Sequence, residues 1–428
     1  MGLYIHIPFC EKKCPYCDFN TYAGLENLYE RTVDAICMEL KRWKEPLAHR
    51  QIHTIFLGGG TPTALEIPAL AKIFETIRET FQLDAACEIT SEVNPGTVDR
   101  EKFSGLRSIG INRLSIGVQS FQPSELAFLG RIHSVEDVYK AYDAARLAGF
   151  DNINLDFMFG LKEQSKAAWQ DTLAQAINLS PEHLSLYSLI VEPNTPLHHW
   201  VSSGQVTVPD NDYTGALYEM AIDALGEADY QQYEVSNWSK RAKQQSESKR
   251  ERESTEEPKY ACQHNLIYWR NHEYLGVGPG AHSSLRLSRE RLTAGLASDP
   301  FEQSDEDAMS DEAHDITWLR WGNRKPVPSY GQRIRNGESV TDFYEVTDPL
   351  TSMGETMMLG LRLTKEGVAY RRFEALHKAD VRTVFRSEFE QLQAWDVLQL
   401  DGKRVRLTSK GLMVGNQIFM RFLPQSND

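Results

Sequence analysis

The chain has 428 residues, and 60 aspartates and glutamates outnumber its 46 lysines and arginines, which gives a formal net charge of −14 at pH 7. Hydrophobic residues make up 41% of the chain, charged residues 25% and aromatic residues 10%, a balance that excludes disordered, collagen-like and membrane-spanning proteins. The acidic surplus also argues against nucleic acid as a partner, because phosphate binding needs clustered lysines and arginines.

The amino-terminal residues MGLYIHIPFC lack the basic region and the small-residue cleavage site of a signal peptide. No apolar run in the sequence approaches the roughly 18 residues that a membrane-spanning helix needs. We therefore expect a cytoplasmic protein without a transmembrane segment.

The first half of the chain alternates short β-branched runs with long amphipathic stretches, which is typical of βα units with a parallel sheet. Strands are predicted over Leu3–Ile7, His53–Leu57, Cys87–Val93, Asn112–Val118, Asn152–Phe157 and His183–Leu189. Helices are predicted over Leu25–Lys44, Pro68–Phe81, Ser134–Ala148, Ser165–Asn178 and Asp212–Asp229. A closed barrel would need about eight units. Six units predict an α/β fold with an open, partial (βα)6 barrel, whose ligands lie at the carboxyl ends of the strands.

Two segments interrupt this pattern. Residues 239–259 are almost entirely polar and charged, and residues 298–315 carry eight acidic residues and no lysine or arginine. Such segments bury too little apolar surface to offset the entropy of ordering, so we expect solvated surface insertions without a site of their own.

The sequence after Pro349 predicts a smaller α+β domain. Its expected elements are helices over Thr351–Leu363, Tyr370–Leu376 and Val381–Gln393, a hairpin formed by Val397–Leu400 and Val405–Leu407 around Asp401-Gly402, and a final helix from Ser409. Helices followed by a small β-wing resemble a winged-helix module. We therefore predict a barrel domain over 1–235, a connecting region over 236–348 and a winged-helix-like domain over 349–428.

Three of the six cysteines form the spacing Cys10-x3-Cys14-x2-Cys17 directly after the first predicted strand. Thiolates this close in one loop can bind one soft metal centre. A structural zinc ion normally takes four protein ligands, and no fourth ligand stands nearby, so the set suits a [4Fe–4S] cluster with one iron left open. A zinc site with a remote fourth ligand, or unligated thiols, are the alternatives. Cys37 and Cys87 are predicted to be buried small hydrophobic residues.

Glycines and polar side chains follow the later strands. The second strand ends in Gly58-Gly59-Gly60-Thr61, where glycine permits a close approach of a ligand to the backbone, although a tight turn alone explains the pattern equally well. Glu92, Gln119, Arg131 and Asp156 lie in or just beyond apolar runs. Each of them is either a ligand-binding residue or a satisfied structural polar group.

The cysteine spacing, with Tyr16 before the last cysteine, is similar to the signature of the radical S-adenosylmethionine superfamily. The motif Tyr4-x-His6-x-Pro8-Phe9-Cys10 resembles the coproporphyrinogen-oxidase-like branch of that superfamily. The resemblance implies a partial (βα)6 barrel and a [4Fe–4S] cluster whose open iron is chelated by the amino and carboxylate groups of S-adenosyl-L-methionine. It also implies that Tyr4 and Tyr16 flank this cofactor.

The resemblance further implies a set of cofactor-binding residues, which are Gly59, Gly60, Thr61, Glu92, Gln119, Arg131 and Asp156. In that set the glycine and threonine backbone and Glu92 would meet the methionine amino group. Arg131 would pair with the methionine carboxylate, and the other two side chains would bind the ribose hydroxyls.

Two features distinguish members of the branch. Coproporphyrinogen dehydrogenases carry a further cysteine two residues after the third one and an arm before the first strand, whereas this chain has Phe19 at that position and starts almost directly with the strand. The segment Cys262–Trp269 contains HNxxYW, which resembles the motif of the heme chaperones of this branch. His264 can ligate heme iron while Tyr268 and Trp269 cover the macrocycle. His272 and His282 are nearby in sequence and equally able to ligate the iron. Alternatively, the aromatic residues belong to the core and His264 is a hydrogen-bonded scaffold residue.

The resemblance therefore implies a heme chaperone that binds heme and passes it to an acceptor protein of unknown identity, with at most a transient contact to a membrane protein. We expect no porphyrinogen oxidase activity, while cleavage of S-adenosylmethionine is compatible with the motifs. The alternative is an oxygen-independent coproporphyrinogen oxidase, in which a 5′-deoxyadenosyl radical abstracts hydrogen from a propionate side chain. A winged-helix nucleic-acid binder is a third alternative, which the acidic charge disfavours.

Overall fold

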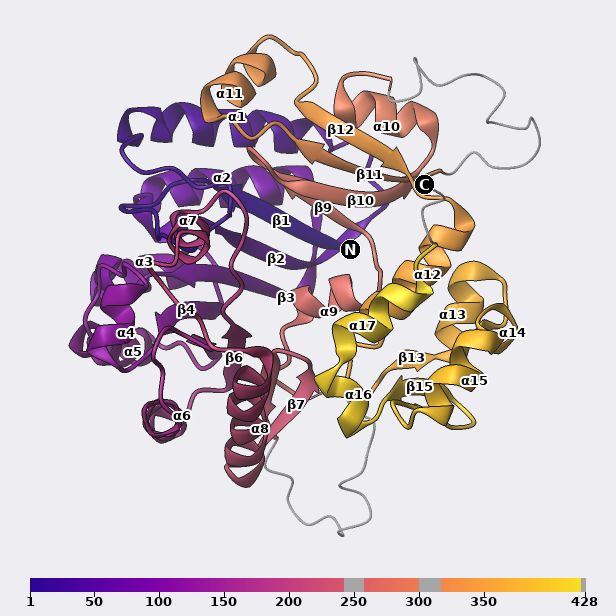
Figure 1. Ribbon diagram of the computed structural model, residues 1–428. Coiled ribbons are helices and arrows are strands. Elements are labelled where there is room, and N and C mark those ends of the chain that lie inside the picture. The colour runs from indigo at the N-terminus through magenta and orange to yellow at the C-terminus, as the bar shows by residue number, and fades with distance from the viewer. Residues whose placement is uncertain (242–257, 300–316, 425–428) are drawn as a thin grey trace.

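The computed structural model describes residues 1–241, 258–299 and 317–424 (Figure 1). Its main feature is one large sheet, which is built of β1 (Gly2–Ile7), β2 (Gln51–Gly59), β3 (Gln82–Val93), β4 (Arg113–Gln119), β5 (Ile153–Phe159), β6 (His183–Ser188), β7 (Tyr230–Glu234), β8 (Asn237–Lys240), β9 (Tyr274–Val277), β10 (His282–Leu287), β11 (Thr317–Asn323) and β12 (Thr341–Val346). The strand order in the sheet is β12-β11-β10-β9-β1-β2-β3-β4-β5-β6-β8-β7.

Strands β1 to β6 pair in parallel in chain order, and all six predicted strands are among them. The helices that alternate with them are α1 (Tyr29–Arg42), α2 (Ile67–Thr80), α3 (Arg100–Ser108), α4 (Pro123–Phe128), α5 (Val135–Leu147), α6 (Lys166–Leu179), α7 (Pro196–Ser202) and α8 (Asn211–Glu227). Strand β1 is buried along nearly its whole length, as expected where helices cover a parallel sheet. The predicted α/β fold with six βα units is confirmed.

Three helices of the barrel, α3, α4 and α7, are absent from the sequence prediction, and α3 is the longest of the three. It begins where the Asp99 side chain accepts a hydrogen bond from the backbone N–H of Lys102, at 2.8 Å. The helix is short and buries only Phe103 and Leu106, so its apolar periodicity is weak. A capping residue, rather than an amphipathic stripe, marks this helix in the sequence.

The region predicted to be a connecting segment extends the sheet instead. Strand β9 pairs in parallel with β1, and β10, β11 and β12 follow in antiparallel order. This region also contains α9 (Gln263–Trp269), α10 (Arg289–Leu296) and α11 (Val327–Arg335). Of the two predicted surface insertions, residues 239 and 240 belong to β8, while 242–257 and 300–316 lie outside the described residues.

The carboxyl-terminal elements pack around a hydrophobic core of their own, which includes Met357, Phe373, Phe389 and Phe422. They are α12 (Pro349–Gly360), β13 (Val368–Ala369), α13 (Tyr370–His377), α14 (Val381–Val384), α15 (Arg386–Ala394), β14 (Leu398–Leu400), β15 (Arg404–Leu407), α16 (Ser409–Met413) and α17 (Gly415–Phe419). The small sheet has the order β13-β15-β14. The predicted helix over Val381–Gln393 is divided at Phe385, whose backbone leaves the helical region while its ring enters the core.

Helix α9 lies between the two parts of the molecule. It packs against β2 of the large sheet on one side and against α12 of the carboxyl-terminal part on the other (Figure 1). The three domain boundaries given above stay predictions. Among the described residues, no helix combines the length and the apolar character needed to cross a lipid bilayer.

Candidate functional site

The loop after β1, residues 8–22, holds the three cysteines and is called the cysteine loop below. Two backbone hydrogen bonds close its base: Cys10 N–H donates to Tyr22 O at 2.9 Å, and Tyr22 N–H donates to Pro8 O at 2.7 Å. Cys10, Cys14 and Cys17 are half-buried and form no disulfide. The closed base thus presents three thiols from one short loop at the carboxyl end of β1.

A hydroxyl and a guanidinium lie close to the thiols of the cysteine loop. Burial raises the pKa of Cys10, although the Thr61 hydroxyl, 3.7 Å from its Sγ, opposes the rise. Arg131 Nη1 lies 3.7 Å from Cys14 Sγ. Within the described residues, no three Cys, His, Asp or Glu side chains are close enough to hold one metal ion. The thiolates of an iron–sulfur cluster bind different irons, so their sulfurs need not meet at one point.

The glycine turn, residues 58–61 at the end of β2, packs against the start of the cysteine loop. A Cβ on Gly60 would lie 2.4 Å from the carbonyl oxygen of Phe9, and Gly59 has a φ of +108°. Gly60 N–H donates to Ile7 O at 2.8 Å, and Thr61 N–H donates to Phe9 O at 2.7 Å. Glycine is therefore required here by a close backbone approach, whether or not a ligand is present.

Two buried carboxyl groups lie inside the barrel. Glu92 Oε2 accepts a hydrogen bond from Gly59 N–H at 3.1 Å, and burial, followed by the nearby Asp156, raises the pKa of Glu92 to about 8. Asp156 accepts from Ser115 Oγ and from Asn154 Nδ2, both at 2.8 Å, and burial raises its pKa as well. Asp156 stands in the middle of β5 rather than at its end. A cation placed between these groups would be stabilised.

Arg131 follows α4 and reaches back to β4. Its Nη2 donates to Gly117 O at 3.1 Å, and its buried Nε has no hydrogen-bond partner among the described residues. Gln119 has a φ of +70°, which directs the chain sharply after β4. A Cβ on Gly117 would lie 2.9 Å from Gln119 Nε2 and 3.3 Å from Arg131 Nη2. The two side chains therefore meet over Gly117, and the guanidinium keeps an unsatisfied donor.

One tyrosine, Tyr4, lies on β1 before the cysteine loop, and a second, Tyr16, lies within the loop. The Tyr4 hydroxyl forms a 3.0 Å hydrogen bond with His6 Nδ1, and the Tyr4 ring stacks on Phe56 at 6.3 Å. Tyr16 packs against a small apolar cluster that includes Leu129, and burial raises its pKa. Of the predicted cofactor-binding residues, Thr61 and Arg131 contact the cysteine loop directly, and Glu92 is linked to the neighbouring turn through Gly59 N–H.

His264 is not placed as a heme ligand would be, and this corrects the sequence-based expectation. The residue is 1% exposed, its Nδ1 is hydrogen-bonded to Thr54 Oγ1 at 2.8 Å, and its Nε2 to the Tyr268 hydroxyl at 2.9 Å. Its ring also stacks on Phe56 at 5.3 Å. Burial, followed by the charge of Arg113, lowers the pKa of His264 to about 3. Both ring nitrogens are occupied, so the hydrogen-bonded scaffold role is the one that fits.

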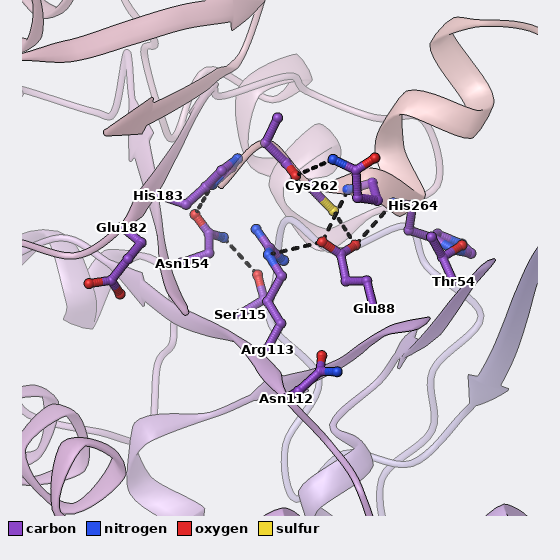
Figure 2. Close-up of polar contacts among 12 residues, drawn as sticks. Thr54, Glu88, Asn112, Arg113, Ser115, Asn154, Glu182, His183, Cys262 and His264 are labelled. Atoms are coloured by element: carbon purple, nitrogen blue, oxygen red, sulfur yellow. Dashed lines mark hydrogen bonds and ion pairs between the residues drawn. The ribbon is translucent and has the colours of Figure 1, made fainter. Parts of the chain in front are cut away.

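The residues that hold α9 in place are missing from the sequence-based prediction. Glu88 accepts hydrogen bonds from the backbone N–H groups of Gln263 and His264, both at 3.1 Å, and lies 4.0 Å from Arg113 Nε (Figure 2). Cys262 Sγ is 3.7 Å from the same carboxylate. A buried ion pair therefore satisfies the free N–H groups at the start of α9. An acidic residue within an apolar strand is the only sequence signal for it.

The glycine-rich segment after β9 also lies beside the cysteine loop. Gly278 N–H donates to Glu39 Oε2 at 2.9 Å, and a Cβ on Gly278 would lie 2.5 Å from His6 O. Asn20 Nδ2 donates to Pro279 O at 2.8 Å. The segment therefore supports the cysteine loop from β9.

Comparisons with known proteins agree with this geometry. Residues 4–176 match the radical SAM superfamily, and residues 348–414 match the HemN C-terminal domain. Heme chaperone HemW of Bacillus subtilis is 33% identical over 98% of this chain and 98% of its own, and that of Escherichia coli is 40% identical over 68% of this chain and 72% of its own. The mitochondrial radical S-adenosyl methionine domain-containing protein 1 of Danio rerio is 30% identical over 99% of this chain and 86% of its own.

Among solved structures, coproporphyrinogen III oxidase (HemN) from Escherichia coli, a radical SAM enzyme, has a TM-score of 0.76 and 21% identity, and the match covers 98% of this chain and 89% of that one. At this identity the likeness establishes the fold. The two heme chaperones above are 33% and 40% identical to this chain over 98% and 72% of their own length. The chain therefore belongs to the HemW family, within the radical S-adenosylmethionine superfamily.

Proposed function

We propose that the protein is a heme chaperone, which binds heme and passes it to an acceptor protein. The observation that carries the proposal is the identity to relatives named heme chaperone HemW, which reaches 33% over 98% of both chains. The HNxxYW segment that resembles the heme-chaperone motif is present at residues 264–269. Fold alone would not choose this function, because the same scaffold serves different chemistry in its relatives.

We also propose that Cys10, Cys14 and Cys17 hold a [4Fe–4S] cluster with one open iron. When bound, the cluster supplies an electron and a coordination site for S-adenosylmethionine. Three half-buried thiols presented by one short, closed loop support this assignment.

The residues around the cysteine loop have separate tasks toward S-adenosylmethionine. Arg131 has a buried Nε without a hydrogen-bond partner in the part of the chain that the structure describes, and it can pair with the methionine carboxylate. Glu92, whose pKa burial raises to about 8, becomes a better acceptor once a cationic amino group lies beside it. Gly59, Gly60 and Thr61 contribute backbone, since no side chain fits at Gly60. Asp156 and Gln119 are assigned to the ribose, and Tyr4 and Tyr16 flank the cofactor.

We propose that the protein does not oxidise coproporphyrinogen. The decarboxylating relatives carry a cysteine two residues after the third cluster cysteine, and this chain has Phe19 there, which is 60% exposed. A phenyl ring provides neither a thiol nor an acidic proton. Slow cleavage of S-adenosylmethionine to 5′-deoxyadenosine is retained in this proposal, because the residues assigned to the cofactor are all present.

The test is anaerobic reconstitution with iron and sulfide, followed by hemin titration and a coproporphyrinogen turnover assay on the same sample. We expect hemin binding, seen as a Soret band that saturates, and no protoporphyrinogen. Multiple turnovers to protoporphyrinogen without hemin binding would replace the chaperone with the oxidase alternative. A reconstituted protein that holds zinc but no iron would overturn the cluster assignment.

A further inference from the structure

A cavity of about 800 Å³ lies at the amino ends of β1, β2 and β3. The cysteine loop follows the opposite, carboxyl end of β1, so the length of this strand, about 20 Å for six residues, separates the two places. Leu376 of α13 closes the cavity from the carboxyl-terminal part of the molecule, and residues at the end of α9 line another side. The cavity has the size of a cofactor pocket and lies outside the site described above.

The charged side chains that line the cavity are mostly positive, whereas the chain as a whole is negative. Its lining includes the arginines Arg50, Arg270 and Arg286 and only two carboxylates, although the whole chain carries a net charge of −14. Arg50 pairs with Glu273 at 2.8 Å, and Arg270 pairs with Glu366 at 2.7 Å.

The third arginine of the wall is differently placed. The Arg286 guanidinium stacks on the Trp318 ring at 3.8 Å and forms no ion pair with any of the described residues. Its half-buried position lowers its pKa, since burial disfavours the charged form. A cation without a carboxylate partner in a cavity attracts an anionic ligand.

The histidines around the cavity differ in whether their ring nitrogens are free. His53 Nδ1 is 2.8 Å from Asp84 Oδ2, and the His49 ring contacts Arg291. His272 follows α9, and its backbone N–H donates to Ile267 O at 2.9 Å. Its imidazole nitrogens make no hydrogen bond with the described residues. Partial desolvation, followed by the charges of Arg372 and Arg270, lowers the pKa of His272 to about 4, while the residue stays accessible to solvent. Its ring is therefore neutral at pH 7 and has a lone pair to offer.

We propose that this cavity is the heme site, with His272 as the iron ligand and Arg286 as the partner of a heme propionate. The inference rests on the proposed chaperone function and names the place where it is carried out. Iron porphyrin matches three features of the cavity. Its propionate can pair with Arg286, its iron can be bound by His272, and its large flat apolar face can lie against the apolar part of the wall. The apolar contacts come from Ile267 and Leu376. An acceptor protein could take heme from this cavity without contacting the cysteine loop, which lies at the other end of β1.

The first test is hemin titration of the reconstituted full chain, its His272→Ala variant, and the control His199→Ala, whose histidine lies on α7 away from the cavity. We expect His272→Ala to shift the Soret band and to weaken hemin binding at least tenfold, while His199→Ala and the iron–sulfur absorption stay unchanged. A His272→Ala protein with the wild-type spectrum and affinity overturns the ligand assignment. The same holds if His53→Ala, rather than His272→Ala, loses the wild-type spectrum.

The second test uses Arg286→Gln with hemin and with hemin dimethyl ester, which lacks the propionate charges. If Arg286 binds a propionate, the variant should lose about tenfold to a hundredfold in hemin affinity, the range for a hydrogen bond to a charged group, and almost nothing in affinity for the ester. Equal losses for both porphyrins, or no loss for either, overturn this role.

Hemin titration separates the proposed chaperone function from the proposed location of the heme site. Wild-type protein that binds no hemin refutes the proposed function. Wild-type protein that binds hemin while both cavity variants are unaffected refutes only this cavity.

Discussion

Replacing Glu88 by Gln tests whether the buried ion pair under α9 holds this helix in place. Gln keeps the shape of the side chain and an oxygen for the N–H groups of Gln263 and His264, but it removes the negative charge 4.0 Å from Arg113. Arg113 is 1% exposed, so its charge cannot turn to water. Breaking one half of a buried pair lowers the free energy of unfolding by about 3–5 kcal/mol. We expect about 3 kcal/mol, because Asp156 also stabilises the Arg113 charge.

The assay is urea unfolding of the full chain, combined with hydrogen exchange of the amides in α9. Asp84→Asn is the matched control, because Asp84 lies on the same strand but its 2.8 Å contact with His53 is partly exposed to solvent. This control should change the free energy of unfolding by less than about 1 kcal/mol. The double variant Glu88→Gln with Arg113→Met should be more stable than Glu88→Gln alone. A Glu88→Gln protein within about 1 kcal/mol of wild type, with unchanged exchange in α9, would refute the reasoning.

The remaining predictions concern the site around the cysteine loop. Alanine at any one of the three loop cysteines should abolish the visible absorption of the iron–sulfur centre, whereas Cys37→Ala, at a buried position on α1, should retain it. Arg131→Ala should weaken S-adenosylmethionine binding by about 1.5–3 kcal/mol with unchanged iron content, and calorimetry showing equal affinity would contradict the carboxylate assignment. Glu92 has a raised pKa of about 8, so its contribution to stability is present below pH 4.5 and is lost as the pH rises through 8. Glu92→Gln should flatten the stability–pH curve in that window, as urea titrations at several pH values would reveal.

Local patterns predicted the cysteine loop and the glycine turn, while long-range pairings escaped prediction. Three cysteines in one loop and three glycines at a strand end are contiguous, so their spacing is visible in the sequence. His264 owes its scaffold role to Thr54, which is 210 residues away. A motif of residues 264–269 shows which side chains occur together, but not that β2 occupies the nitrogen that a heme iron would need. Glu88 and Cys262 likewise meet only in the folded chain, 174 residues apart.

The order of the strands in the large sheet also depends on long-range pairings that the sequence does not show. The four strands β9 to β12 are short or lie between polar segments, so their sequence reads as a connection. The position of each strand in the sheet depends on the strand with which it pairs. Strand β9 pairs with β1 although the two are about 270 residues apart in the sequence. Periodicity identifies a strand, whereas the order of strands depends on contacts that the sequence does not display.

The position of β1 between β2 and β9 sets the order in which the chain can fold during synthesis. Gly2 pairs with Thr54 on one side and with Tyr274 on the other, so one edge of β1 stays open until about 270 further residues have been made. At about 5–20 residues per second, this takes roughly 15–50 seconds on the ribosome. The cysteine loop leaves from that same strand, and its support from the segment after β9 arrives only then. Nascent chains therefore carry exposed thiols and an unpaired strand edge for most of their synthesis.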